Sequence, residues 1–230
     1  AEATARGVQF VTREACREKK ISLKGAKVVV QGFGNAGSVA ARLLGEDGAS
    51  IIAVSDSSGG ILNPKGLDIT AVLAHKESTG SLRGFRNADS ISNERLLELE
   101  CDVLVPAALE NQITQANAGR VRAKIVAEAA NGPTTPGADE ILHKNGVFSI
   151  PDILANAGGV TVSYFEWVQS LQAFFWEEAQ VNHHLEKVMT RAFNEVLAIS
   201  KKFNVHMRAA AYLLAVGRVA EATRIRGIYP

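Results

Sequence analysis

The sequence contains little cysteine and no long apolar run. Its 230 residues include two cysteines, Cys16 and Cys101, which are too few and too far apart to indicate a disulfide framework or a metal cluster. We therefore predict no metal site, and the scarcity of cysteine favours a reducing cytoplasm. The apolar stretches fall well short of the roughly 18 residues that a membrane-spanning helix needs, and the N-terminus does not resemble a signal peptide. A disulfide-rich secreted protein and a membrane protein are both disfavoured.

An excess of charge of one sign is also missing. Lys and Arg together number 25 and Asp and Glu number 24, for a formal net charge of +1. We expect no nucleic-acid partner, because such partners require a basic surface and no basic stripe stands out. A GxSxG nucleophile elbow and a Walker-type GxxxxGK loop are absent from the sequence as well. His183 and His184 are adjacent, so on a helix they point about 100° apart and do not form a shared metal face.

Short apolar runs that alternate with amphipathic segments are the main pattern of the first two thirds of the chain. The runs fall at 27–31, 51–55, 102–106, 124–128 and 147–150. Runs of this kind with helices between them are typical of parallel strands buried on both faces. The pattern predicts an α/β fold with a doubly wound (Rossmann), mostly parallel sheet. Thr135 precedes Pro136 and predicts a helix start there, with the hydroxyl as its cap.

Helical patterns flank this predicted sheet on both sides. The segment from about 2 to 20 is helical, and strand signals stop after about residue 156. Apolar residues then recur at helical spacing from Val181 to Ile199, and a similar pattern runs from His206 to about Arg226. We expect one dinucleotide-binding domain over 1–230, with a Rossmann core at about 21–155 and a helical segment at about 156–230.

The sharpest motif is Gly-Phe-Gly-Asn-Ala-Gly at 32–37, directly after the first predicted strand. In a dinucleotide fingerprint of this kind, Gly32 permits the tight turn, Gly34 lets the backbone approach a pyrophosphate, and Gly37 allows close packing of helix on strand. The helix N-terminus offers N–H donors to the anion. The motif and its context predict a nucleotide site that includes Phe33 and Asn35.

Asp56 ends the next strand, about 20 residues after the fingerprint, where we expect a carboxylate to accept hydrogen bonds from both ribose hydroxyls. A negative charge at this place repels the 2′-phosphate of NADP and favours NAD. The alternative stays open, because Ser57, Ser58 and Lys65 are able to bind a phosphate if their loop folds over it. We expect NAD, or else NADP, as cofactor.

Later strand ends carry further polar or small residues toward the same edge of the sheet. Ala107 and Ala108 leave room for a ribose or nicotinamide ring, and Asn131 follows the next strand with an amide. Asn156 begins a glycine-rich stretch before the first long helix, and Ser163 lies one turn further on. We expect these residues to line one cleft.

The same segments resemble the cofactor-binding, C-terminal half of glutamate dehydrogenases of the hexameric bacterial and archaeal type, within the Glu/Leu/Phe/Val dehydrogenase family. The resemblance extends from end to end and rests on these motifs: Ala-Thr at 3–4, Gln-Gly-Phe-Gly-Asn-Ala-Gly at 31–37, Val-Ser-Asp at 54–56, Pro-Ala-Ala at 106–108, Ala-Asn-Gly-Pro-Thr-Thr at 130–135, and Asn-Ala-Gly-Gly-Val-Thr-Val-Ser-Tyr-Phe-Glu-Trp at 156–167.

The resemblance implies roles for individual residues. Thr4 contacts the nicotinamide carboxamide, and Gly34 and Asn35 contact the pyrophosphate and its flanking ribose. Asn131 and Asn156 lie by the nicotinamide ribose. Val160 and Ser163 meet the substrate side chain, and the Ser163 hydroxyl donates to the γ-carboxylate. The full set of cofactor residues we expect is Thr4, Gly32, Phe33, Gly34, Asn35, Gly37, Asp56, Ser57, Ala107, Ala108, Asn131 and Asn156.

The resemblance also implies the reaction, an oxidative deamination of L-glutamate to 2-oxoglutarate and ammonium with hydride transfer to the nicotinamide, and a hexameric homo-oligomer. In the family, the catalytic lysines and aspartate lie in a separate N-terminal domain, and no lysine-bearing glycine segment of that kind occurs in this sequence. We therefore expect no catalytic residue in this chain and no turnover by it alone. Two alternatives remain open: a stand-alone dinucleotide-binding module, or a leucine, valine or phenylalanine dehydrogenase, in which we expect an apolar residue in place of Ser163.

Overall fold

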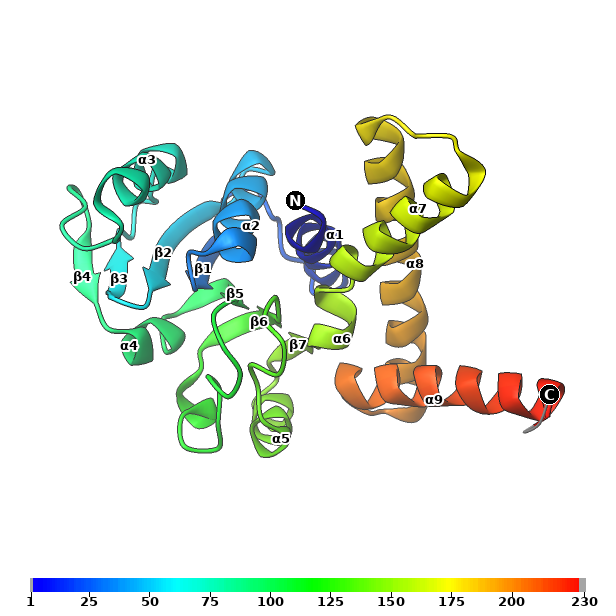
Figure 1. Cartoon of the computed structure of the whole chain (residues 1–230). Helices are drawn as coiled ribbons and strands as arrows, with labels where there is room; N and C mark the ends of the chain where they lie inside the picture. The colour runs from blue at the N-terminus through cyan, green and yellow to red at the C-terminus, as the bar shows by residue number, and fades with distance from the viewer. Residues whose placement is uncertain (1, 228–230) are drawn as a thin grey trace.

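The computed structural model describes residues 2–227, and among them seven strands form one sheet (Figure 1). The strand order is β4-β3-β2-β1-β5-β6-β7. The strands are β1 (Lys27–Gln31), β2 (Ser50–Asp56), β3 (Gly59–Leu62), β4 (Asp89–Ile91), β5 (Cys101–Pro106), β6 (Ala123–Ala127) and β7 (Phe148–Ile150). Strands β2, β1, β5, β6 and β7 are mutually parallel. The predicted α/β, doubly wound sheet is therefore confirmed, with all five predicted strands present.

Two strands were not predicted from the sequence, β3 and β4. Strand β3 pairs antiparallel with β2, and β4 pairs antiparallel with β3. Both are short and carry little of the Val and Ile enrichment that marks a buried strand, and β3 begins with two glycines. They extend one side of the sheet and make it mixed.

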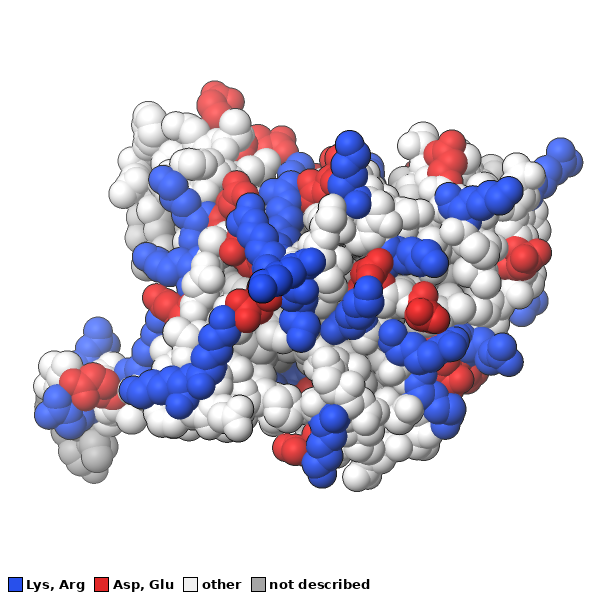
Figure 2. Space-filling view, turned by 180° about the vertical axis from the view of Figure 1, so that it is seen from behind, with Lys and Arg blue, Asp and Glu red and all other residues white. Residues whose placement is uncertain are grey.

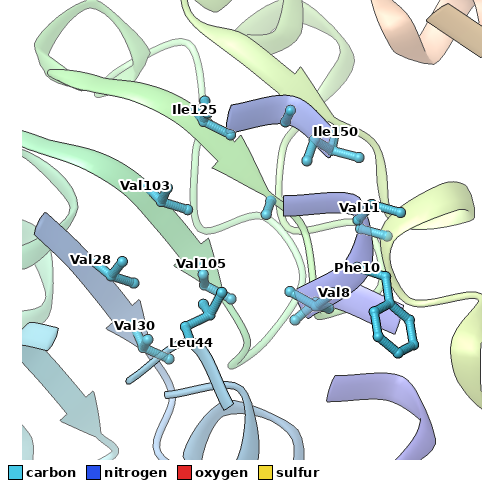
Figure 3. Close-up of a cluster of buried hydrophobic side chains, with 14 of the residues drawn as sticks. Val8, Phe10, Val11, Val28, Val30, Leu44, Val103, Val105, Ile125 and Ile150 are labelled. Atoms are coloured by element: carbon cyan, nitrogen blue, oxygen red, sulfur yellow. The ribbon is translucent and has the colours of Figure 1, made fainter. Parts of the chain in front are cut away.

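Helices cover both faces of the sheet. Successive strand residues point to opposite sides, so the apolar side chains of a strand lie on both faces and both need a cover. Val28 and Val30 of β1 lie in one core cluster, with residues of α1 (Ala3–Glu18), α2 (Asn35–Glu46) and α8 (Glu178–Phe203). Val29 lies in a second cluster, with residues of α4 (Asn93–Leu97) and α5 (Pro136–Lys144). Figure 3 shows Val8 and Val11 of α1 among side chains from β5, β6 and β7 in the first cluster. The predicted N-terminal helical flank therefore forms part of the core.

The remaining helices are α3 (Ile69–Thr79), α6 (Asp152–Ala155), α7 (Gly158–Gln172), α9 (Met207–Arg226) and a short 3-10 turn at Ala118–Arg120. Helix α5 begins with Pro136 as predicted, but the Thr135 hydroxyl makes no capping hydrogen bond. That detail of the prediction was wrong: the Thr135 carbonyl instead accepts from the backbone N–H groups of Ala138 and Asp139.

The C-terminal helices are continuous with the sheet core. The predicted apolar stripe of α8 places Leu185, Met189 and Val196 in the same buried cluster as the strands, and Phe193, which was not part of the prediction, joins them there. Helix α9 contributes Met207, Ala210 and Ala211 from its first turns, and Figure 1 shows the rest of α9 projecting from the body. Among residues 2–227, no helix is long and apolar enough to cross a membrane.

Several large apolar side chains of α7, of the turn after it and of α9 remain exposed. Phe165 is buried, and its ring is tilted by 54° against that of Trp176 with the two centroids 5.6 Å apart. Those exposed by half or more are Val160, Tyr164, Trp167, Leu171, Phe174, Phe175, Tyr212, Leu213, Val216, Val219 and Ile225. Exposed apolar groups on this scale are typical of a surface that another body covers.

Both cysteines are buried as free thiols. Burial raises the pKa of Cys16 to about 11 and that of Cys101 to about 12. Neither thiol is therefore ionised near neutral pH, and both behave as inert core groups.

We predict that Phe193→Ala destabilises the whole molecule, because Phe193 is 1% exposed within the cluster that α8 shares with the sheet. The expected loss is about 3–5 kcal/mol of unfolding free energy, in a single cooperative transition. Phe203→Ala is the matched control, since Phe203 lies on the same helix but is 53% exposed, and its effect should stay within about 0.5 kcal/mol. Urea denaturation followed by circular dichroism measures both. Equal losses, or separate transitions for helices and sheet, contradict the shared core.

Candidate functional site

The predicted site residues lie at the carboxyl edge of the parallel strands, where the chain changes direction across the sheet. Strand β1 is central, and the chain fills β2, β3 and β4 on one side of it before β5, β6 and β7 on the other. Gln31 at the end of β1 is level with Ser55 of β2 and Pro106 of β5. The segments after these three strands therefore meet at one place, which is the usual ligand position in an open α/β sheet.

The fingerprint turn depends on two glycines in backbone contact. Gly32 has φ of +92°, and a Cβ at this position would lie 2.7 Å from the backbone of Ala107 and Ala108. A Cβ on Gly37 would lie 1.8 Å from the carbonyl oxygen of Gly32. Both positions therefore require glycine, and together they pack the start of α2 on the turn after β1 and on the end of β5.

Gly34 differs from the other two glycines, because a Cβ there would meet nothing within 4 Å. Gly34 is the N-cap of α2 and is exposed, with no side-chain capping bond at this end of the helix. The first N–H groups of a helix have no partner inside it. The N-terminus of α2 therefore presents N–H donors and the positive end of the helix dipole to the open space at Gly34, as in an anion site.

Phe33 contributes to the site through its backbone. Its side chain is 2% exposed and belongs to the core. Its carbonyl oxygen accepts a hydrogen bond of 2.5 Å from the Lys76 ammonium of α3. The predicted contact of Phe33 with a cofactor therefore rests on main-chain atoms.

Asp56 lies at the end of β2, and its carboxylate is already engaged. Oδ1 accepts from the N–H and the hydroxyl of Ser58 at 2.8 and 2.5 Å, and Oδ2 accepts from the N–H of Leu82 at 3.0 Å. Burial alone would raise the pKa of Asp56, but these hydrogen bonds and the nearby Lys76 charge hold it below its ordinary value. Asp56 is therefore ionised at neutral pH. Since a carboxylate has about four acceptor positions, it has room for one ribose hydroxyl and not for both.

Lys76 is the site residue that the sequence analysis missed. Its Nζ lies 3.8 Å from Asp56 Oδ2 and 5.7 Å from the centroid of the Phe33 ring. Lys65 was considered instead, and that expectation was wrong. Because β3 runs antiparallel to β2, the chain returns to the start of β2, and Lys65 lies beside Ser50 at the opposite end of the strand from Asp56. Ser57 is exposed next to Asp56, as its predicted role requires.

The amides of Asn131 and Asn156 are brought together. Asn156 ends α6 and donates to Asn131 Oδ1 at 2.7 Å and to the carbonyl of Ala130 at 3.4 Å. The carbonyl of Pro106 accepts from the N–H groups of Ala129 and Ala130. The pair therefore lies on the β5–β6 side of the fingerprint. Ala107 packs against Gly37, and Ala108 is exposed.

Thr4 reaches this part of the molecule through a close crossing of α1 and α7. A Cβ on Gly7 would lie 2.9 Å from the backbone of Gly158, and one on Gly158 would lie 2.1 Å from the carbonyl of Ala3. The Thr4 hydroxyl lies 2.7 Å from the place of a Cβ on Gly159. Helix α1 therefore presents Thr4 to the start of α7, the helix that carries Val160 and Ser163.

Val160 and Ser163 are both exposed on α7, Val160 by 71%. The Ser163 hydroxyl donates to the carbonyl of Gly159 at 3.1 Å, one turn earlier in the same helix. A hydroxyl in this arrangement keeps its acceptor lone pairs, and it must rotate to donate to a substrate carboxylate.

The chain matches the glutamate/leucine/phenylalanine/valine dehydrogenase family over residues 1–227. The chain belongs to this family. It is 55% identical over 230 residues to glutamate dehydrogenase of Thermotoga maritima, covering 100% of this chain and 55% of the relative. It is 51% identical over 225 residues to the cryptic catabolic NAD-specific glutamate dehydrogenase of Bacillus subtilis, covering 98% and 52%.

Solved structures of the family agree with this assignment. The hetero-hexameric glutamate dehydrogenase of Thermus thermophilus, in its Leu-bound form, superposes with a TM-score of 0.93 at 36% identity, over 99% of this chain and 54% of that one. Glutamate dehydrogenase of Peptoniphilus asaccharolyticus gives 0.84 at 37% identity, over 99% and 53%. The chain thus spans about half the length of the relatives that it matches.

We predict opposite outcomes for two glycine variants of the fingerprint. Gly37→Ala places a methyl group against the Gly32 carbonyl and should cost about 3 kcal/mol or more of unfolding free energy. The methyl group of Gly34→Ala meets open space, so this variant should lose less than about 1 kcal/mol of unfolding free energy. It should nevertheless weaken NADH binding, because the methyl group occupies the expected place of the pyrophosphate. Urea denaturation and an NADH titration separate the two. Wild-type NADH affinity in Gly34→Ala contradicts a pyrophosphate at this helix end.

Proposed function

We propose that this chain is the dinucleotide-binding part of a glutamate dehydrogenase, and that it binds NAD(H) in preference to NADP(H). The observation that carries the proposal is the geometry of the 32–37 turn. Its two outer glycines are in backbone contact, and its middle glycine leaves open space at the N-terminus of α2. That combination suits a pyrophosphate lying across the helix end.

The preference for NAD rests on Asp56. Its carboxylate stands at the end of β2, is held by Ser58 and Leu82, and remains ionised at neutral pH. A fixed negative charge at the adenine ribose repels a 2′-phosphate. Lys76 offsets part of this repulsion from 3.8 Å. The Bacillus subtilis relative is named NAD-specific, which supports the same choice.

Glutamate as substrate rests on Ser163 and on the named relatives. A hydroxyl at an exposed position of α7, one turn after Val160, is a group able to donate to a γ-carboxylate. A site that hydrogen-bonds a polar substrate rejects an apolar one strongly. Both curated relatives are named glutamate dehydrogenases.

We further propose that the rest of the active site lies in a second domain, and that the complete protein is a homo-oligomer. The relatives are about twice as long as this chain, which supports a second domain. One structural relative is named hetero-hexameric, which supports an assembly of several subunits, while identical subunits rest on the family resemblance alone. The exposed apolar side chains of α7 and α9 supply a surface for such contacts. Deamination at an α-carbon requires an acid and a base, and in this proposal neither comes from this chain.

The first test is a fluorescence titration of the chain with NADH and with NADPH. We expect saturable binding of both, with NADH tighter. Asp56→Asn should narrow that preference by about tenfold, equivalent to ~1.4 kcal/mol, because it removes the charge that repels the 2′-phosphate. Asp89→Asn is the control, since it removes a carboxylate from an exposed strand on the same sheet, level with Leu62 and away from Asp56. Absence of binding refutes the proposal; an unchanged preference in Asp56→Asn refutes only the role of Asp56.

The second test is a turnover assay. We expect the purified chain to produce no NADH above background from L-glutamate and NAD, since it lacks the acid and base. Full-length glutamate dehydrogenase of Thermotoga maritima, assayed in parallel, is the positive control. Sustained NADH production by the chain alone would show that its own residues carry the chemistry.

A further inference from the structure

Arg208 occupies a buried position among three carboxylates: Glu128 directly after β6, Asp139 of α5 and Asp152 of α6. It belongs to the first turn of α9, and its side chain is 14% exposed. One guanidinium nitrogen donates to both oxygens of Glu128, at 2.5 and 2.7 Å, and another donates to Asp152 Oδ1 at 2.8 Å. The third, Nε, donates to Asp139 of α5. Every guanidinium nitrogen is therefore used, which is the geometry that makes arginine hard to replace by lysine.

The charges of this cluster are strongly unbalanced. The side chains of Glu128 and Asp139 are 0% and 3% exposed, so bulk water solvates neither carboxylate. Burial raises the pKa of Glu128 in spite of Arg208. Burial would lower the pKa of Arg208, but Glu128 and Asp139 raise it. Loss of the single cation leaves buried carboxylates that repel one another.

The carboxylates in turn hold the backbone next to the two site amides. Asp152 Oδ2 accepts from the N–H of Gly132 at 2.8 Å, one residue after Asn131. Glu128 Oε2 accepts from the N–H of Asp152 at 2.9 Å, at the start of α6, whose C-cap is Asn156. Asn156 donates to Asn131. Two hydrogen bonds thus separate Arg208 from the turn that carries Asn131.

We propose that Arg208 is a positioning residue for the nicotinamide half of the bound dinucleotide. Through Asp152 and Glu128 it fixes the 131–133 turn and the start of α6, and so the distance between the amides of Asn131 and Asn156. The inference rests on the proposed function, because it assumes that these amides face the cofactor. The adenine half lies on the other side of the fingerprint, by Asp56, and shares none of the Arg208 contacts.

This asymmetry separates a positioning role from a merely structural one. If Arg208 only stabilises the fold, its loss affects binding of the whole dinucleotide and of its adenine half alike. If Arg208 positions the nicotinamide end, its removal weakens binding of the whole dinucleotide but not binding of the adenine half alone. ADP carries the adenosine and pyrophosphate without the nicotinamide, and is therefore the comparison ligand.

The experiment titrates NADH and ADP into the wild-type chain and into Arg208→Lys. We expect NADH affinity to fall by at least about tenfold, because lysine cannot make all the charged hydrogen bonds, while ADP affinity stays within about twofold. Arg218→Lys is the matched control, since Arg218 lies on the same helix, is 62% exposed and pairs with Glu195. It should change neither affinity.

Asp152→Asn keeps the test decisive if Arg208→Lys does not fold. It removes one link between Arg208 and the 131–133 turn at a side chain that is 22% exposed, and it should weaken NADH binding and leave ADP binding unchanged. Equal losses for NADH and ADP, or unchanged NADH affinity in the folded variants, overturn the positioning role while the proposed function stands. A wild-type chain that binds neither ligand overturns both.

Discussion

Direct backbone contact between glycines is the constraint on which the site depends. Gly37 packs directly against the carbonyl of Gly32. The backbones of Gly7 and Gly158 are in contact where α1 crosses α7. The first contact seats the N-terminus of α2 over the end of β1 and β5. The second brings Thr4 to the helix that carries Val160 and Ser163. Neither contact allows a Cβ, so both places require glycine for the same steric reason.

A network of polar and charged side chains lies on each side of the open space that the glycines leave. Asp56, Ser58 and Lys76 form the polar end on the β2 side, and Arg208 with its three carboxylates forms the other on the β6 side. Only the second network is strongly buried, and it ties α9 to loops that follow β6 and β7. On the molecular face in Figure 2, basic and acidic side chains are interspersed. The networks of Asp56 and Arg208 are buried or half-buried, and in this they differ from the charges exposed on the surface.

Much of the architecture is readable from the sequence, and the failures have identifiable causes. The five parallel strands coincide with short apolar runs that are easily recognised in the sequence, and residues 32–37 form a motif whose steric logic is local. Strands β3 and β4 are short and weakly apolar, and missing them put Lys65 at the wrong end of β2 and left Lys76 unnoticed. Arg208 carries no motif, because its partners lie 56 to 80 residues away. The contacts that position a site are non-local, and single-sequence patterns report only local ones.

In the proposed complex, the dinucleotide lies along the carboxyl edge of the sheet, from Asp56 across the start of α2 to the amides of Asn131 and Asn156. A crystal structure of the chain with NADH tests this most directly. We expect the pyrophosphate within hydrogen-bond distance of the first N–H groups of α2, one adenine-ribose hydroxyl on Asp56, and the nicotinamide ribose beside Asn131 and Asn156. NADH bound with its pyrophosphate away from Gly34, or with its adenine at the Asn131 end, would contradict it.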